Sequence, residues 1–439
     1  MNTLSLSWKN ILSNPLNTLM SVLLFALSIA LITFLFLFNY QFRHGLDKNL
    51  AGIDLVIGAK GSPLQLILNS MYHIDAPTGN ITLQEAAPFL NPAHPLVAHA
   101  VPLSLGDSYG AYRIVGTTPS ILKLYGAEKI TGEIYKDDFE TLIGDVVAHK
   151  LKLNLGDEFY STHGLMDNPD MAHDHGSHFV VKGILQSTGT VLDQLILCTP
   201  QTIWKVHSHD SLSTSEDEHT LSEIRKTNTN SAVINLDSTE IKVLTDSINS
   251  SLKGNPEMEI TSLLLQFRNR TSIQSLNLLR NINQNTGMMA ASPAYEINRL
   301  YAILGTGAEA IQYLAILIAI VAAISIFISL YTSLKSRRYE MAIMRVSGAG
   351  PGKITNMIIG EGLWIAILGI ILGLASGHIG MELAGNILQK SYHYQFTGWI
   401  WHPEELYIIL GAIFIGLLAS IIPAIEGSRT ELHSTLAEN

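Results

Sequence analysis

The sequence predicts an α-helical membrane protein with four transmembrane helices and a large α+β extracytoplasmic domain between the first and second spans. Four apolar runs, almost free of charged residues, are each long enough to cross the roughly 30 Å of hydrocarbon in a bilayer. The region between the first two runs, residues 43–305, contains no further such run and mixes short strand-like and helix-like patterns. The mean hydropathy of +0.26 is high for a soluble protein but low for a bundle of many spans.

The overall composition narrows the function classes. The net charge of −10 argues against nucleic-acid binding, so we expect no nucleic acid among the partners. The single cysteine, Cys198, excludes an intramolecular disulfide and a cysteine-rich metal site. No small-residue cleavage pattern follows the first apolar run, so we expect a retained span rather than a cleaved signal.

The N-terminal segment, residues 1–15, is predicted to be an interfacial amphipathic helix, followed by transmembrane helix 1 over residues 16–42. At helical spacing one face of the first segment is apolar, which is typical of a helix that lies along the bilayer surface. The alternative is that this segment is only the frayed start of the first span. The apolar face consists of Leu4, Trp8, Ile11 and Leu12.

Residues 43–305 are predicted to fold as one α+β domain outside the cytoplasm. Alternating apolar residues between turn signals predict strands at Asp54–Gly58, Leu96–Leu105, Tyr112–Gly116, Glu158–Ser161, Phe179–Leu185, Gln194–Cys198 and Ala232–Asn235. Helical spacing predicts helices at Leu64–Met71, after Asp145, and at Ser238–Leu252. The segment Leu276–Leu304 is expected to be one amphipathic helix that runs into the second span.

The C-terminal part is predicted to contain three more spans, at residues 306–334, 354–388 and 405–425. A cytoplasmic coupling loop or helix at 335–353 and an external loop at 389–404 join them, and a cytoplasmic tail follows at 426–439. Gly369, Gly373 and Gly377 recur every four residues along the third span, a pattern that lets another helix pack closely. The alternative is a glycine-rich span with no defined partner helix.

The distribution of basic residues predicts the topology. If the N-terminus is cytoplasmic, the main basic residues outside the large domain fall on the cytoplasmic side of the membrane: Lys9, the segment Lys335–Lys353 and Arg429. The large domain and the loop at 389–404 then lie on the other side. We therefore expect a multi-pass protein of the bacterial cytoplasmic (inner) membrane with its large domain in the periplasm.

The segment Ser333–Glu361 connects the second and third spans and has an unusual pattern. A basic stretch precedes one apolar helical turn, Met341–Met344, and Gly348, Gly350 and Pro351 then break the helix. The order of residues resembles the loop between the second and third spans of the FtsX-like (MacB-type) permease family. The matching residues are Arg337, Glu340, Met341, Ile343, Met344, Arg345, Gly348, Ala349 and Glu361. The alternative is an ordinary positively charged cytoplasmic loop.

The resemblance implies the permease subunit of an ABC transporter, which transmits ATP-driven motion from a separate cytoplasmic ATPase to its periplasmic domain for export or for work on the cell envelope. It assigns contact with that ATPase to Arg337, Arg338, Glu340, Met341, Ile343, Met344, Arg345, Gly348 and Ala349. It also implies a homodimer or a pair of related permeases, with a periplasmic adaptor or substrate-binding protein as a further partner. The alternative in the same family is a non-transporting regulator that acts on a periplasmic partner.

No nucleotide-binding or hydrolase motif is found in the sequence, so we expect no enzymatic activity in this chain. ATP and Mg²⁺ would be bound by the partner ATPase, and no cofactor is expected in the chain itself, apart from zinc in one open hypothesis. A histidine- and aspartate-rich stretch could hold zinc, because imidazoles and carboxylates are typical zinc ligands, and the chain would then be a zinc-handling permease as a second alternative function. Equally, it could be a solvated polar loop. Its candidate ligands are His163, Asp170, His173, Asp174, His175 and His178.

Three ionisable residues lie in or near the predicted spans, where charge is costly. Glu361 is expected to form a structural ion pair with a basic residue of the coupling loop, such as Arg345. Glu309 is expected at the outer membrane interface. His378 is expected to be a polar group near the outer end of its span, without a direct role in function.

Overall fold

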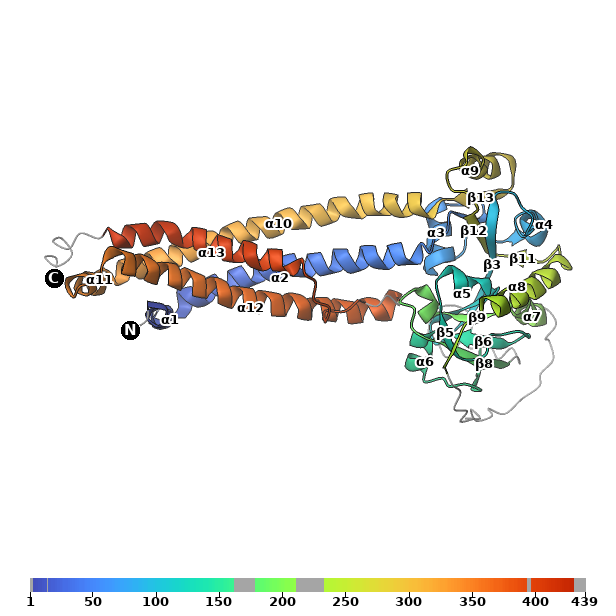
Figure 1. Cartoon of the computed structure of the whole chain (residues 1–439), viewed down its shortest axis with the longest axis horizontal. Helices are drawn as coiled ribbons and strands as arrows, with labels where there is room; N and C mark the ends of the chain where they lie inside the picture. Colours follow the sequence, from blue (N-terminus) through green and yellow to red (C-terminus); the bar gives the residue numbers. More distant parts are fainter. Residues whose placement is uncertain (1–2, 14, 162–177, 211–232, 393–395, 430–439) are drawn as a thin grey trace. The chain divides into compact units, whose positions relative to one another are not determined.

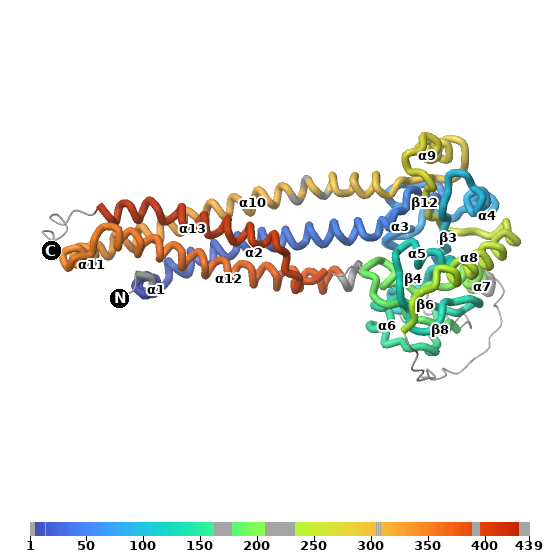
Figure 2. The backbone as a smooth tube through the Cα atoms, in the orientation of Figure 1, coloured from blue at the N-terminus to red at the C-terminus, as the bar shows by residue number. Residues whose placement is uncertain are grey.

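The computed structural model describes residues 3–13, 15–161, 178–210, 233–392 and 396–429 (Figure 1). The chain divides into two compact units. One contains residues 1–43 and 302–439, and the other contains residues 44–301. The first unit is helical and the second contains the β-sheets, as the backbone trace in Figure 2 shows.

The helical unit contains the predicted spans. Among the residues that the structure describes, four helical segments are long and apolar enough to cross a membrane: Pro15–Asn49, Glu309–Ser336, Pro351–Leu388 and Glu405–Ser428. This confirms the four predicted apolar helices, while their insertion in a bilayer stays a prediction. This unit contains α1 (Thr3–Ser13), α11 (Arg338–Val346), α12 (Pro351–Tyr392), α13 (Glu405–Ser428) and most of α2 (Pro15–Asn49) and α10 (Pro293–Ser336).

The glycine stripe of α12 faces α2. A Cβ atom on Gly369 would lie 2.6 Å from a ring carbon of Phe25, and one on Gly373 would lie 2.6 Å from Cβ of Ile29. A Cβ on Gly377 would approach Thr33 to 2.9 Å. Real side chains do not approach this closely, so the helix backbones can pack at this distance only because these positions lack a side chain.

Within the described part of the chain, the second unit is built on a mixed sheet of 11 strands. The path is β10-β5-β8-β6-β9-β4-β3-β12-β1-β13, with β7 pairing to β8 off this path, and a two-stranded sheet joins β11 and β2. The pairs β4–β9 and β6–β8 are parallel and the other pairs are antiparallel. The strands are β1 (Leu55–Ala59), β2 (Ile81–Thr82), β3 (Val97–Tyr109), β4 (Tyr112–Thr117), β5 (Lys129–Gly132), β6 (Glu140–Ile143), β7 (Glu158–Tyr160), β8 (His178–Leu185), β9 (Ile196–Cys198), β10 (Val233–Asn235), β11 (Glu259–Ile260), β12 (Ser262–Phe267) and β13 (Met288–Ala291).

Helices pack on this sheet and complete the unit. A main cluster of the core joins α6 to β4, β8 and β9 through buried residues such as Val147, Ile114, Phe179 and Ile196. The sheets are formed by residues that lie, along the sequence, between the first two long helices, which confirms the α+β character predicted for this region. The helices are α3 (Pro63–Tyr72), α4 (Leu83–Ala86), α5 (Ser120–Leu124), α6 (Asp145–Leu151), the 3₁₀ turn η2 (Val191–Gln194), α7 (Pro200–Asp210), α8 (Ser238–Lys253) and α9 (Ile273–Asn285).

The prediction of one continuous helix over residues 276–304 is wrong. Helix α9 ends at Asn285, Thr286 adopts an extended backbone, and Met288–Ala291 form the strand β13 before α10 begins at Pro293. Strand β13 pairs with β1 and its residues Met288, Ala290 and Ala291 are buried. Pairing with a distant strand thus overrides the local helical pattern. Strands β2, β5, β6, β11 and β12 were also not predicted from the sequence.

Candidate coupling site at the turn between α10 and α12

Helix α11 lies between two backbone breaks. Helix α10 ends at Ser336, Arg337 leaves the helical conformation with φ of −112° and ψ of 20°, and α11 then runs from Arg338 to Val346. At its C-terminal end Gly348 has a φ of +94°, and the N–H groups of Gly348 and Ala349 donate to the carbonyls of Arg345 and Met344. This is a Schellman end, in which glycine is favoured because it tolerates positive φ. Gly348 and Ala349 therefore shape the turn.

The inner face of α11 packs within the helical unit. Met341 and Ala342 are 2% and 1% exposed, and Met344 is half-buried. Met341 belongs to a core cluster with Leu334, Ile354, Met357, Ile358 and Ala424, and Met344 packs against that cluster. Two of the apolar residues expected to contact a partner, Met341 and Met344, thus anchor α11 to its own chain. Their burial makes them positioning residues for the helix.

The outer face of α11 carries an exposed apolar stripe. Tyr339, Ile343 and Val346 are 46%, 45% and 68% exposed. They stand at spacings of four and three residues, so their side chains share one face of the helix. Arg338 and Glu340 are also exposed. Ile343 is the member of this stripe predicted from the sequence; Tyr339 and Val346 were not predicted, although the 3.6-residue period starting from Ile343 contains both.

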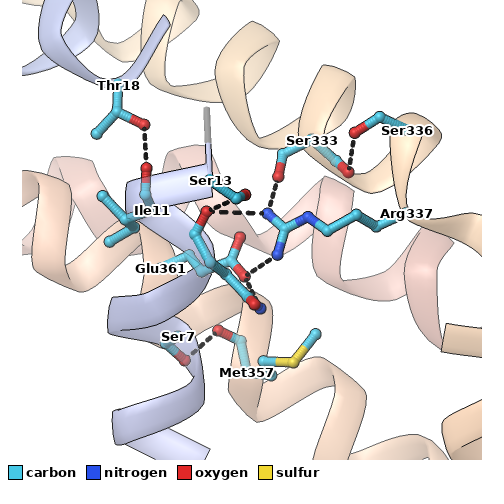
Figure 3. A network of polar contacts seen from close by, with 10 residues as sticks. Ser7, Ile11, Ser13, Thr18, Ser333, Ser336, Arg337, Met357 and Glu361 are labelled. Carbon is cyan, nitrogen blue, oxygen red and sulfur yellow. Dashed lines mark hydrogen bonds and ion pairs between the residues drawn. The ribbon is translucent and has the colours of Figure 1, made fainter. Parts of the chain in front are cut away.

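Arg337 and Glu361 form an ion pair that connects the helices around α11 (Figure 3). Nη1 of Arg337 lies 3.6 Å from Oε1 of Glu361, and the two side chains are 14% and 6% exposed. Glu361 therefore does pair with a basic residue of the connecting segment, and the ion pair that the structure shows uses Arg337 where we expected Arg345. Arg337 also donates a hydrogen bond to Oγ of Ser333, one turn earlier in α10.

Helix α1 completes this network through polar side chains. Nδ2 of Asn10 donates to Glu361 at 2.7 Å, and the carbonyl of Asn10 accepts from Arg337 at 3.4 Å. Oγ of Ser7 donates to the carbonyl of Met357 at 2.8 Å. These contacts tie α1 to α10 and α12, and the bond from Ser7 to Met357 can be followed in Figure 3. Only the apolar face of α1 was predicted to have a role, and the contacts of Ser7 and Asn10 were not predicted.

The apolar residues of α1 divide between core and surface. Ile11 is buried in the core between the long helices, and the ring of Trp8 meets Trp364 edge-on with centroids 5.0 Å apart. Leu12 is 59% exposed. A cavity of about 220 Å³ remains between α1, α10, α11 and α12 beside the ion pair. Its lining includes Asn10, Arg337, Met341, Met344 and Glu361.

A weaker surface contact links α11 to α13. Nη2 of Arg338 lies 3.8 Å from Oε1 of Glu426, and both side chains are more than 40% exposed. An ion pair in this setting is screened by water and contributes about 0–1 kcal/mol. The buried Arg337–Glu361 pair is therefore the main polar attachment of this region among the described residues.

His378 is held more firmly than an isolated interfacial group. Its Nδ1 lies 2.6 Å from the carbonyl of Gly398, and its Nε2 lies 3.0 Å from Oε2 of Glu405, whose side chain is 0% exposed. The ring of Trp401 stacks on it. The contacts hold the segment before α13 against α12. Glu309 is exposed in the helical unit.

The zinc hypothesis falls mostly on residues outside those that the structure describes, namely His163, Asp170, His173, Asp174 and His175. His178 is described, at the start of β8, where its Nε2 lies 3.2 Å from the hydroxyl of Tyr160 and its Nδ1 lies 3.9 Å from Glu158. Among the described residues, no group of three or more histidine, cysteine or acidic side chains could hold a metal ion.

One comparison with known proteins bears on this site. Residues 313–432 match the family model described as FtsX-like permease C-terminal, and this range includes the end of α10, all of α11 and α12, and α13. No curated protein matches the chain.

Proposed function

We propose that this chain, which belongs to the FtsX-like permease family through residues 313–432, is the membrane subunit of an ABC transporter of the MacB type. In this proposal a separate cytoplasmic ATPase binds ATP and Mg²⁺, and α11 receives its movement. The observation that carries the proposal is the two-sided character of α11. Its inner face is fixed in the core of the helical unit, while Tyr339, Ile343 and Val346 form an uncovered apolar stripe.

The contacts that attach α11 to its neighbours explain how a force applied to the apolar stripe of α11 would move the long helices. Arg337 lies at the junction of α10 and α11 and contacts both Glu361 on α12 and Asn10 on α1. A displacement of α11 would therefore act on α10, α12 and α1 through these partly buried contacts. We propose that the long helices transmit this motion to the sheet-containing unit, which performs export or envelope work in the periplasm.

We further propose that the chain works as a homodimer or beside a related permease in the inner membrane. Helix α10 has many uncovered apolar residues, among them Leu317, Ile320, Ile324 and Ile328. Lipid covers such residues in a membrane, and a second permease subunit would cover part of them. A periplasmic adaptor or substrate-binding protein is a further proposed partner.

The test is a mild detergent pull-down of the tagged full chain, with mass spectrometry of the proteins that come with it. An ABC ATPase should accompany the wild type. Ile343→Glu should abolish this co-purification, because a buried carboxylate in an apolar contact costs several kcal/mol. Val243→Glu is the matched control, since Val243 is a similarly exposed aliphatic residue on α8.

Retention of the ATPase by Ile343→Glu, at wild-type yield, would contradict the assignment of the stripe. Absence of any ATPase from the wild type under several mild detergents would contradict the proposed function itself. Both outcomes depend on a protein that remains folded, so thermal unfolding of each variant is measured in the same detergent.

A further inference from the structure

A groove in the sheet-containing unit is not used by the coupling mechanism. It has a volume of about 240 Å³ and lies between α8, α5, the start of β3 and residues 89–92. Its base is apolar and well packed, with Phe89, Val97 and Ile241 each less than 9% exposed. The volume is below that of a typical pocket for a drug-sized ligand but is sufficient for one or two side chains.

Cationic side chains surround this groove. Lys123 on α5 and Lys242 on α8 line it and are exposed. Arg268 stands beside it, with its guanidinium donating to the carbonyls of Pro92 at 2.8 Å and His94 at 3.2 Å. The net charge of the chain is −10, so this concentration of positive charge is local. A field of this sign attracts anions.

Two other groups nearby define the electrostatics more closely. Burial, followed by the charges of Lys123 and Arg268, lowers the pKa of His99, so this histidine is neutral at pH 7 and does not add to the positive charge. Asp246 is the acidic residue among those that line the groove. Basic side chains therefore outnumber acidic side chains at the groove.

Two buried oxygen atoms in the groove lack a partner. Oγ1 of Thr245 and Oδ1 of Asn249 are shielded from solvent and form no hydrogen bond with another described protein group. Both residues line the groove and are four positions apart on α8, so they share one face of that helix. Buried polar atoms are nearly always hydrogen-bonded, so this pair suits a ligand that brings its own donors.

We propose that this groove binds an acidic peptide segment of a partner protein. An aspartate or glutamate side chain would lie between Lys123, Lys242 and Arg268, and peptide N–H groups would donate to Thr245 and Asn249 once these two side chains rotate toward the groove. A bare inorganic anion fits less well, because it brings few donors for the two buried oxygens. The site is independent of α11 and goes beyond the proposed coupling function.

The experiment measures binding of a fluorescein-labelled Asp-Gly repeat peptide to the full chain in detergent, by fluorescence anisotropy. The expected result is saturable binding that weakens with added salt, with an Asn-Gly peptide of the same length binding at least tenfold more weakly. Lys242→Glu should weaken binding by about tenfold or more, because it reverses a charge at the groove. Thr245→Val and Asn249→Leu should each weaken peptide binding by a smaller factor than Lys242→Glu, and this loss of affinity should depend less on the salt concentration.

Lys253→Glu is the matched control, because Lys253 is an exposed lysine on the same helix that does not line the groove. It should leave the affinity within about twofold of wild type, since exposed charges outside a site act only through a screened field. Equal weakening by Lys253→Glu and Lys242→Glu would show a general charge effect and overturn the proposal. Displacement of the peptide by equimolar inorganic phosphate, or absence of saturable binding, would also overturn it. Co-purification of an ATPase is unaffected by any of these outcomes.

Discussion

Replacement of Arg337 by Met should destabilise the helical unit and detach α11, because it leaves Glu361 buried without its cation. The two charges are 3.6 Å apart. At an effective dielectric constant of about 20, their attraction is about 5 kcal/mol before the cost of desolvation is subtracted. Removal of one partner from a buried pair typically costs about 3–5 kcal/mol. Asn10 remains as a neutral donor to Glu361 and cannot replace the positive charge.

The corresponding assay is thermal unfolding of the purified chain in detergent, followed by intrinsic fluorescence. At about 2–4 °C per kcal/mol, Arg337→Met should lower the unfolding temperature by about 6–20 °C. Arg338→Ala is the control, because its ion pair with Glu426 is exposed, and it should lower the temperature by no more than about 4 °C.

A double variant separates charge from packing. Arg337→Met combined with Glu361→Leu removes both buried charges and should recover most of the loss, since apolar replacements of a buried pair are often neutral. An unfolding temperature for Arg337→Met equal to that of Arg338→Ala would refute the argument that this pair holds α11. So would a double variant that is as unstable as the sum of its single variants.

Two further predictions concern helix packing and pH. Gly373→Ala should lower the unfolding temperature, because its Cβ would lie 2.6 Å from Cβ of Ile29 and overpacking costs about 1–3 kcal/mol. Gly411→Ala is the control: a Cβ there meets no atom within 4 Å, so the unfolding temperature should stay unchanged or rise. Equal shifts for the two variants would contradict the close packing at Gly373. Burial, and then the charge of Arg113, lower the pKa of His73 from 6.5 to about 3. Its contribution to stability is therefore complete above pH 6.5 and is lost as pH falls toward 3, by up to about 1.4 kcal/mol per unit. Asparagine tolerates the φ of +53° at this position, so His73→Asn should flatten the dependence of urea-unfolding stability on pH between pH 6.5 and 4. An unchanged slope in His73→Asn would contradict this assignment.

The sequence by itself determined the long helices and the breaks between them. Four apolar runs of sufficient length predict the same four helices in any tertiary arrangement, because each helix satisfies its own backbone hydrogen bonds. Gly348 and Pro351 likewise predict the end of α11 and the start of α12 from backbone geometry alone. Local strands such as β1, β4 and β8 follow from their alternating or continuous apolar residues.

The functional face of α11 was only partly predictable. Helical periodicity separates Met341 and Met344 from Tyr339, Ile343 and Val346, but both sets are apolar. Nothing in the local pattern says which set packs on the chain and which remains uncovered. That choice depends on Leu334, Ile354 and Ile358, which other segments bring together only in the folded unit.

Contacts between distant segments were decided only by the tertiary structure. Asn10 and Glu361 are 351 positions apart, and Arg337 pairs with Glu361 from the break between α10 and α11. Strand β13 forms where a helix was expected, because β1 offers backbone partners and a buried surface. Local propensity amounts to a few tenths of a kcal/mol per residue, whereas burial of a side chain contributes about 1.5–3 kcal/mol, so packing overrides propensity wherever the two disagree.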